Sequence, residues 1–96
     1  MNKEEIILFL VAQKESFLRS FGVTKLGLFG SAARGEKPND IDLIVEFEPG
    51  TEDLFEKKFQ IRQILESRFK LPVDICREKF IKPQVKELIM HDVIFV

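Results

Sequence analysis

The sequence contains no tryptophan, no tyrosine, a single cysteine and a single histidine. One cysteine cannot form an internal disulfide, and Cys76 and His91 cannot by themselves build a structural zinc site. The longest apolar run, residues 6–12, is far shorter than the roughly 20 residues that cross a bilayer. Glu4 and Glu5 also interrupt the basic region that a signal peptide needs. These absences predict a cytoplasmic protein in a reducing environment, with no membrane segment.

Charge of one sign is not in excess, because 15 basic and 16 acidic residues leave a net charge of -1. This balance does not favour nucleic acid as a partner. The distribution is uneven, since residues 36–56 hold eight acidic side chains and one lysine, whereas residues 57–87 hold nine basic and four acidic ones. The acidic block suits cations, and the basic block either attracts phosphates or solvates helices.

The length of 96 residues, with 45% apolar and 32% charged side chains, fits one compact domain over residues 1–96. Apolar residues at helical spacing predict three helices, at residues 3–21, 52–69 and 83–90. Gly22 ends the first helix and Thr51 is a candidate N-cap for the second. Short apolar runs predict strands at residues 25–29, 40–47, 71–76 and 93–96. The order predicts an α/β (α+β) fold, with a small β-sheet flanked by helices.

Two aspartates open the most apolar of these strands. Asp40 and Asp42 are two residues apart, so both side chains would lie on one face, about 6 to 7 Å apart along the strand. Aspartate is disfavoured in strands, and Asp74 breaks the same rule in the next strand. Hard cations such as Mg²⁺ take oxygen ligands, and a pair of them can stabilise phosphoryl transfer. We therefore predict that the three carboxylates converge on metal ions, although an isolated pair also fits a loop residue and a solvent-facing strand residue.

The dipeptide Gly30-Ser31 follows the first strand directly. Glycine lets a phosphate approach the backbone, and N–H groups at a helix start can bind phosphate oxygens together with a serine hydroxyl. By itself, Gly-Ser is more often only a turn. The segment is not a P-loop, because Glu36 separates Gly35 from Lys37 and no Ser or Thr follows the lysine.

Taken together, the segment LFGSAARGE at residues 28–36 and the segment DIDLIVEF at residues 40–47 resemble the signature of the DNA polymerase beta type nucleotidyltransferases. Within that superfamily, the chain is similar to the minimal nucleotidyltransferase (MNT) group over nearly its whole length. The resemblance implies a polymerase-beta-type nucleotidyltransferase fold with a mixed sheet. It also implies that Gly30 and Ser31 hold the nucleoside triphosphate, that Asp40 and Asp42 bind two Mg²⁺ ions, and that Asp74 completes the metal site and helps to deprotonate the attacking hydroxyl.

The resemblance further implies a function. Members of the MNT group are commonly encoded beside a small helical HEPN toxin, and some act as antitoxins by moving AMP from ATP to a tyrosine of that toxin. Because this chain has no tyrosine, any tyrosyl acceptor must lie on a partner. Only eight residues separate Ser31 from Asp40, fewer than is usual in the family. This short loop leaves open a catalytically weak antitoxin that acts by binding alone. Transfer to a small molecule is less favoured, because no second domain would form its pocket.

Ten phenylalanines exceed what two thin layers are expected to hide. Helical spacing predicts that the core stripe of the second helix includes Phe55, Phe59, Ile61, Leu65 and Phe69. Because the number of phenylalanines is high, we also predict that this Phe-rich helix and the tail 94–96 present an apolar surface for self-association or for a helical partner. The alternative is that every phenylalanine belongs to the core.

Overall fold

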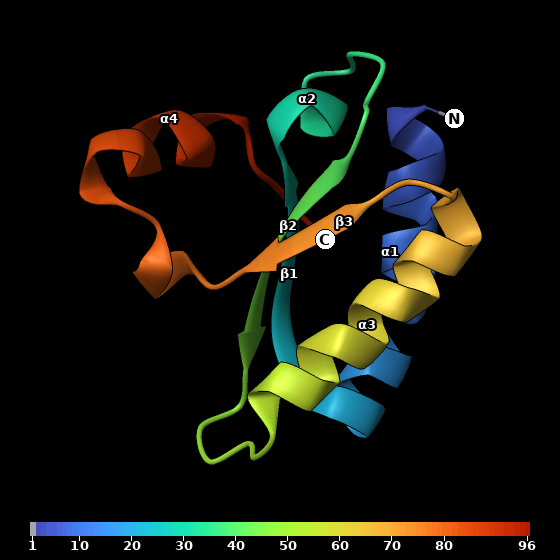
Figure 1. The fold of residues 1–96 in the computed structure, drawn as a ribbon, viewed down its shortest axis with the longest axis vertical. Helices are drawn as coiled ribbons and strands as arrows, with labels where there is room; N and C mark the ends of the chain where they lie inside the picture. Colours follow the sequence, from blue (N-terminus) through green and yellow to red (C-terminus); the bar gives the residue numbers. More distant parts are fainter. Residues whose placement is uncertain (1) are drawn as a thin grey trace.

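The computed structural model describes residues 2–96, which form one four-stranded sheet with helices on both of its faces (Figure 1). In chain order the elements are α1 (Lys3–Phe21), β1 (Val23–Phe29), α2 (Gly30–Ala33), β2 (Ile41–Phe47), α3 (Leu54–Phe69), β3 (Val73–Cys76), the 3-10 turn η1 (Glu78–Phe80), α4 (Pro83–Asp92) and β4 (Ile94–Phe95). The strand order is β3-β2-β1-β4. β1 runs antiparallel to β2 and β4, whereas β2 and β3 are parallel. The predicted mixed sheet with flanking helices is confirmed.

Helices α1 and α3 cover one face of the sheet, and the core lies beneath them (Figure 1). α1 begins at the Asn2 cap, whose side-chain oxygen accepts a hydrogen bond from Glu5 N at 2.9 Å, and ends at Gly22 as predicted. Its buried residues pack against the strand residues whose side chains point to this face. The main contributors are Ile6, Leu10 and Phe17 of α1, Ile61, Leu65 and Phe69 of α3, and Leu26, Leu28, Leu43 and Val45 of the central strands.

The start of α3 differs from the prediction. Thr51 does not cap the helix, because its hydroxyl donates to the carbonyl oxygen of Glu48 at 2.6 Å and closes the preceding turn. Asp53 takes a left-handed conformation (φ 55°), and the helix begins at Leu54. Phe55 and Phe59 were expected in the core stripe, but their side chains are 80% and 37% exposed. The buried stripe of α3 faces the sheet, and these two rings lie outside it.

The opposite face of the sheet is built in three rows, which follow from the strand register. The row nearest α2 contains Phe29, Asp42 and Asp74. The middle row is apolar or small: Phe95, Gly27, Ile44 and Cys76. The third row pairs Lys25 with Glu46. A side chain on Gly27 would collide with the Phe95 ring and Val93, so glycine is what allows β4 to close the sheet.

Helix α4 lies on this second face (Figure 1) and contributes no buried residue. Within residues 2–96, no helix combines the length and the apolar character that a bilayer crossing requires.

Candidate functional site

Asp42 and Asp74 lie side by side on the second face of the sheet. The parallel register of β2 and β3 pairs the two residues directly, and adjacent strands are about 4.8 Å apart. Asp42 is half-buried and Asp74 is exposed. The predicted strand alternation is therefore correct, and it places both carboxylates at the end of the sheet that carries α2.

Asp40 does not share that strand. β2 begins at Ile41, whose N–H donates to the carbonyl oxygen of Pro72 at 2.9 Å, so Asp40 lies in the bend before the first ladder contact. The strand therefore begins one residue later than predicted, and Asp40 directly precedes it. Asp40 still acts on its neighbour: partial burial first, then the negative charges of Asp40 and Asp74, raise the pKa of Asp42. The Arg34 guanidinium opposes this effect by lowering the pKa.

Gly30 brings the first turn of α2 against the Asp42 carboxylate. Its φ of 76° is a left-handed conformation that side chains disfavour. A Cβ atom placed on Gly30 would also collide with the carboxylate of Asp42. Glycine is therefore required here for two reasons, of which the sequence indicated only the close approach of a phosphate. Ser31, the next residue, is half-buried in the same turn.

Arg34 is a charged residue near the site for which the sequence analysis predicted no role. Its guanidinium pairs with Glu36 at 2.9 Å and with Asp92, at the end of α4, at 3.2 Å. These two carboxylates raise the pKa of Arg34, and hydrogen bonds from His91 first and then from Arg34 lower the pKa of Asp92. The Arg34–Asp92 ion pair links α2 to α4, a helix that has no buried side chain. The signal for it was absent because Asp92 is 58 residues away in sequence.

A second charged network fixes the other end of this face. Glu46 accepts hydrogen bonds from the Arg77 guanidinium at 3.2 Å and from Glu78 N at 2.7 Å. Glu78 in turn pairs with Lys25 at 3.2 Å. Because every charge in this network has a partner, it serves to hold the β3–η1 junction on the sheet.

The three predicted ligands are close enough to interact electrostatically, but they do not form a closed ligand cluster. Among residues 2–96, no three Asp, Glu, His or Cys side chains are arranged to hold a metal ion as they stand. Three like charges repel one another, so the carboxylates are expected to turn apart and to come together only around a cation. The oxygen-only donor set suits Mg²⁺ or Ca²⁺ better than softer metals.

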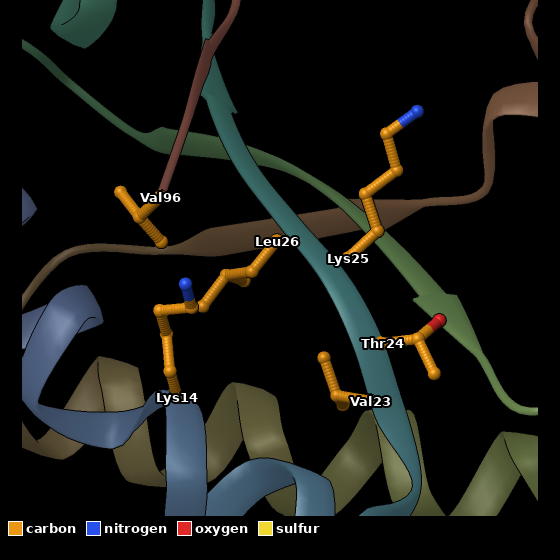
Figure 2. Close-up of a pocket in the computed structure, with 6 residues that line it drawn as sticks. All are labelled: Lys14, Val23, Thr24, Lys25, Leu26 and Val96. Carbon is orange, nitrogen blue, oxygen red and sulfur yellow. The ribbon is translucent and has the colours of Figure 1, made fainter.

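A shallow hollow lies between α1, β1 and the C-terminal residue. It is lined by Lys14 of α1, residues 23–26 of β1 and Val96. Figure 2 shows Lys14, Leu26 and Val96 on one side of β1, with Lys25 pointing the other way. No carboxylate lines this hollow, so it is separate from the aspartates.

Comparison with known proteins covers the segment of the chain that contains these residues. The family model described as "Nucleotidyltransferase domain" matches residues 10–96. The chain is 33% identical over 95 residues to the protein adenylyltransferase MntA of Thermococcus cleftensis, covering 97% of this chain and 94% of that protein. It is 36% identical over 95 residues to a proposed protein adenylyltransferase of Methanocaldococcus jannaschii, covering 96% and 95%.

Solved structures share the fold. A proposed minimal nucleotidyltransferase has a TM-score of 0.76 at 29% identity, over 98% of this chain and 95% of that one. A toxin–antitoxin structure with AMP-PNP has a TM-score of 0.63 at 20% identity, over 99% of this chain and 72% of that one. At this lower identity, the second likeness concerns the fold alone.

Proposed function

The chain belongs to the nucleotidyltransferase domain family, and we propose that it transfers AMP, or another nucleoside monophosphate, from a nucleoside triphosphate to a hydroxyl of a partner protein. The acceptor is proposed to be a small helical toxin of the HEPN type, which the transfer would neutralise. The protein would then be the antitoxin of a two-protein pair. The relative from Thermococcus is named a protein adenylyltransferase, and solved structures of similar fold are toxin–antitoxin assemblies.

The observation that carries this proposal is the register of Asp42 with Asp74 beside the Gly30 turn. This arrangement places two carboxylates, which are suitable metal ligands, beside a backbone turn in which Gly30 has no side chain to block a ligand. A triphosphate needs both, because its charge must be offset and its oxygens need N–H donors.

Each residue has a role in the proposed reaction. The first turn of α2, at Gly30 and Ser31, would hold the triphosphate through backbone N–H groups and the serine hydroxyl. The acceptor hydroxyl oxygen forms a bond to the α-phosphorus, and the bond from that phosphorus to the bridging oxygen of the β-phosphate breaks. Pyrophosphate leaves, and Asp74 takes the hydroxyl proton as the general base.

Asp40, Asp42 and Asp74 would hold Mg²⁺, because their donor set consists of carboxylate oxygens only. The raised pKa of Asp42 reflects crowding that a cation would offset. When bound, two such ions would stabilise the attacking and leaving oxygens of the transfer. This chain's own residues would then align the triphosphate, so that the acceptor approaches in line with the bond that breaks.

The proposal is tested by incubating the protein with ATP labelled at the α-phosphate, Mg²⁺ and the purified protein encoded beside it. We expect label on the partner, no label on this chain, and loss of labelling with EDTA. The matched pair of variants is Asp42→Asn and Asp53→Asn, because Asp53 is an exposed aspartate that immediately precedes α3. Labelling that survives in Asp42→Asn would contradict the proposal.

A second candidate is an antitoxin that acts by binding alone. It is favoured by the position of Asp40 outside β2, because a ligand in a bend is less firmly placed than one in a strand. In that case Asp42→Asn would neutralise the partner as well as the wild type does, and neither protein would label it.

A further inference from the structure

The geometry points to the outer edge of β3, together with residues 55–62 of α3, as the docking site for an extended segment of the acceptor protein. This segment would carry apolar side chains toward α3 and the acceptor hydroxyl on the other side, beside Asp74. The inference rests on the proposed function for the identity of the occupant. The surface itself is defined by a groove, an open strand edge and a contrast of charge.

The groove runs between α3 and β3 and is lined by Phe55, Lys58, Phe59, Arg62 and Ile75. The two phenylalanines are one helical turn apart, so their rings lie on the same flank of α3. Phe55 is 80% exposed, whereas Phe59 is 37% exposed and lies under the Arg62 guanidinium, 5.7 Å from the ring centroid. An exposed ring of this size beside a half-buried isoleucine is typical of an interaction surface.

The backbone of β3 supports pairing with another strand. β3 is an edge strand, and alternate residues of a parallel strand direct their backbone groups to opposite sides. The carbonyl oxygen of Pro72 accepts a hydrogen bond from Ile41 N–H of β2. The backbone groups of Val73 and Ile75 therefore point outward, away from β2. Val73 N–H donates to the Glu66 carboxylate at 2.9 Å. Within residues 2–96, the outward N–H of Ile75 donates no hydrogen bond, so it can pair with an added strand.

Charge selects the occupant. Lys58 and Arg62 make the α3 side of this edge basic beside Ile75, with the single Glu66 carboxylate held at Val73 N–H, whereas Asp74 and Asp42 make the other side acidic. An added strand alternates its side chains between these two sides. The segment that fits has apolar and acidic residues facing α3, and a neutral hydroxyl between them facing Asp74. Because neighbouring strands are about 4.8 Å apart, that hydroxyl residue would stand next to the proposed base.

The same placement explains how so small a domain could select an acceptor. The groove and Asp74 lie on the two faces of one four-residue strand. Docking would therefore fix the hydroxyl in position through the side chains on either side of it in the partner's sequence. A free tyrosine or an unstructured hydroxyl compound would lack those contacts.

The first test compares the double variant Phe55→Ser/Phe59→Ser with the control Leu8→Ser/Val11→Ser, which removes two exposed apolar residues from α1. The measured quantity is the affinity for the purified protein encoded beside this chain, by titration calorimetry in the absence of ATP. We expect the α3 variant to bind at least about tenfold more weakly, about 1.4 kcal/mol, with the control within about twofold of wild type. ATP affinity should be unchanged in both.

The second test reads the strand edge itself. On addition of the partner, amide hydrogen exchange at Ile75 should slow by at least about tenfold, whereas Leu43 in the central strand should be unaffected. The inference is overturned by an equal loss of affinity in both double variants, by no loss in either, or by unchanged exchange at Ile75. Sedimentation of the wild type as a dimer that Phe55→Ser/Phe59→Ser dissociates, with partner affinity retained, would assign the surface to a second copy and overturn it too.

Failure of the proposed function would look different. A partner that binds through Phe55 and Phe59, but is never labelled from ATP, would leave the docking surface intact and remove the transfer. A partner that is labelled at the wild-type rate by the Phe55→Ser/Phe59→Ser variant would leave the transfer intact and exclude the docking surface.

Discussion

The two faces of β2 differ in both burial and charge. On the face under α1 and α3, Ile41, Leu43 and Val45 are at most 1% exposed and belong to one continuous core. On the other face, Asp42 and Glu46 flank a single buried residue, Ile44. One seven-residue strand therefore supplies stability on one side and charge on the other.

The comparison also shows that the second face is not uniformly polar. Its middle row is closed by the Phe95 ring over Gly27, next to Ile44, and its far row is an ion-pair network. Among residues 2–96, the row at α2 is the one in which two carboxylates without an ion-pair partner lie beside a backbone turn. The two faces can thus be separated by substitution, and the variants below are arranged from the largest expected effect to the smallest.

The strongest separation is expected from Asp74→Asn. Removing a general base typically lowers a rate by about 10²- to 10⁴-fold, and we expect a loss in this range for AMP transfer to the partner. Because Asp74 is exposed, the free energy of unfolding should change by no more than about 0.5 kcal/mol. Transfer is measured with ATP labelled at the α-phosphate, and stability by urea denaturation. Equal loss in the control Asp53→Asn would show that the effect is one of net charge and not of position.

The reverse pattern is expected from Leu43→Ala, on the covered face. The side chain is fully buried, so its truncation should cost about 2–5 kcal/mol of unfolding free energy through lost burial and a cavity. Activity per folded molecule should be retained at a temperature where the variant is folded. Urea denaturation and labelling of the same sample measure both quantities. A variant that keeps its stability but loses transfer would abolish the distinction between the two faces.

The sequence was most informative where one physical signal dominates. The N-terminal helix has clear apolar spacing and a terminal glycine, so its bounds Lys3–Phe21 were correct. The predicted start of α3 was wrong. Thr51, Glu52 and Asp53 are residues that favour a helix N-terminus, but the Thr51 hydroxyl donates its hydrogen bond to the carbonyl oxygen of Glu48 in the preceding turn. Local patterns cannot reveal such a competing contact.

The same limit applies to the site. Strand alternation predicted that Asp42 and Asp74 would share a face, because both lie inside strands that pair in register. The predicted start of this strand, at Asp40, was one residue too early. The first hydrogen bond of the ladder is made with Pro72, which is distant in sequence and cannot be located from the local pattern. The exposure of Phe55 and Phe59 was also not fixed by helical spacing, because the width of the covering sheet decides which residues of a flank are buried.

Gly30→Ala tests the contact between α2 and the carboxylates. The substitution places a Cβ at a φ of 76° and against the Asp42 carboxylate, so we expect a loss of about 1–3 kcal/mol in stability together with weaker ATP binding. The control is Gly35→Ala, at a φ of 79° with no atom within 4 Å of the added Cβ. The two variants share the backbone strain and differ in the steric contact. Equal ATP affinity in both would show that the approach of Gly30 to Asp42 has no part in binding.

The smallest effect concerns the pH dependence of stability, and it isolates the electrostatic crowding at Asp42. Partial burial and the charges of Asp40 and Asp74 raise the pKa of Asp42 in the folded protein. Above its ordinary pKa of about 3.9, the folded state therefore binds more protons at this group than the unfolded state does. Stability from this group falls as pH rises from that value through the raised folded pKa, and is then constant. Asn carries no such charge, so the stability of Asp42→Asn relative to wild type should increase across the same interval. Thermal unfolding of both proteins at a series of pH values measures the difference.

At a pH above this interval, excess MgCl₂ should make the wild type more stable than Asp42→Asn, because a cation that binds the folded wild type stabilises it by mass action. A difference that is independent of both pH and magnesium would show that the carboxylates of the second face neither repel one another nor share a cation.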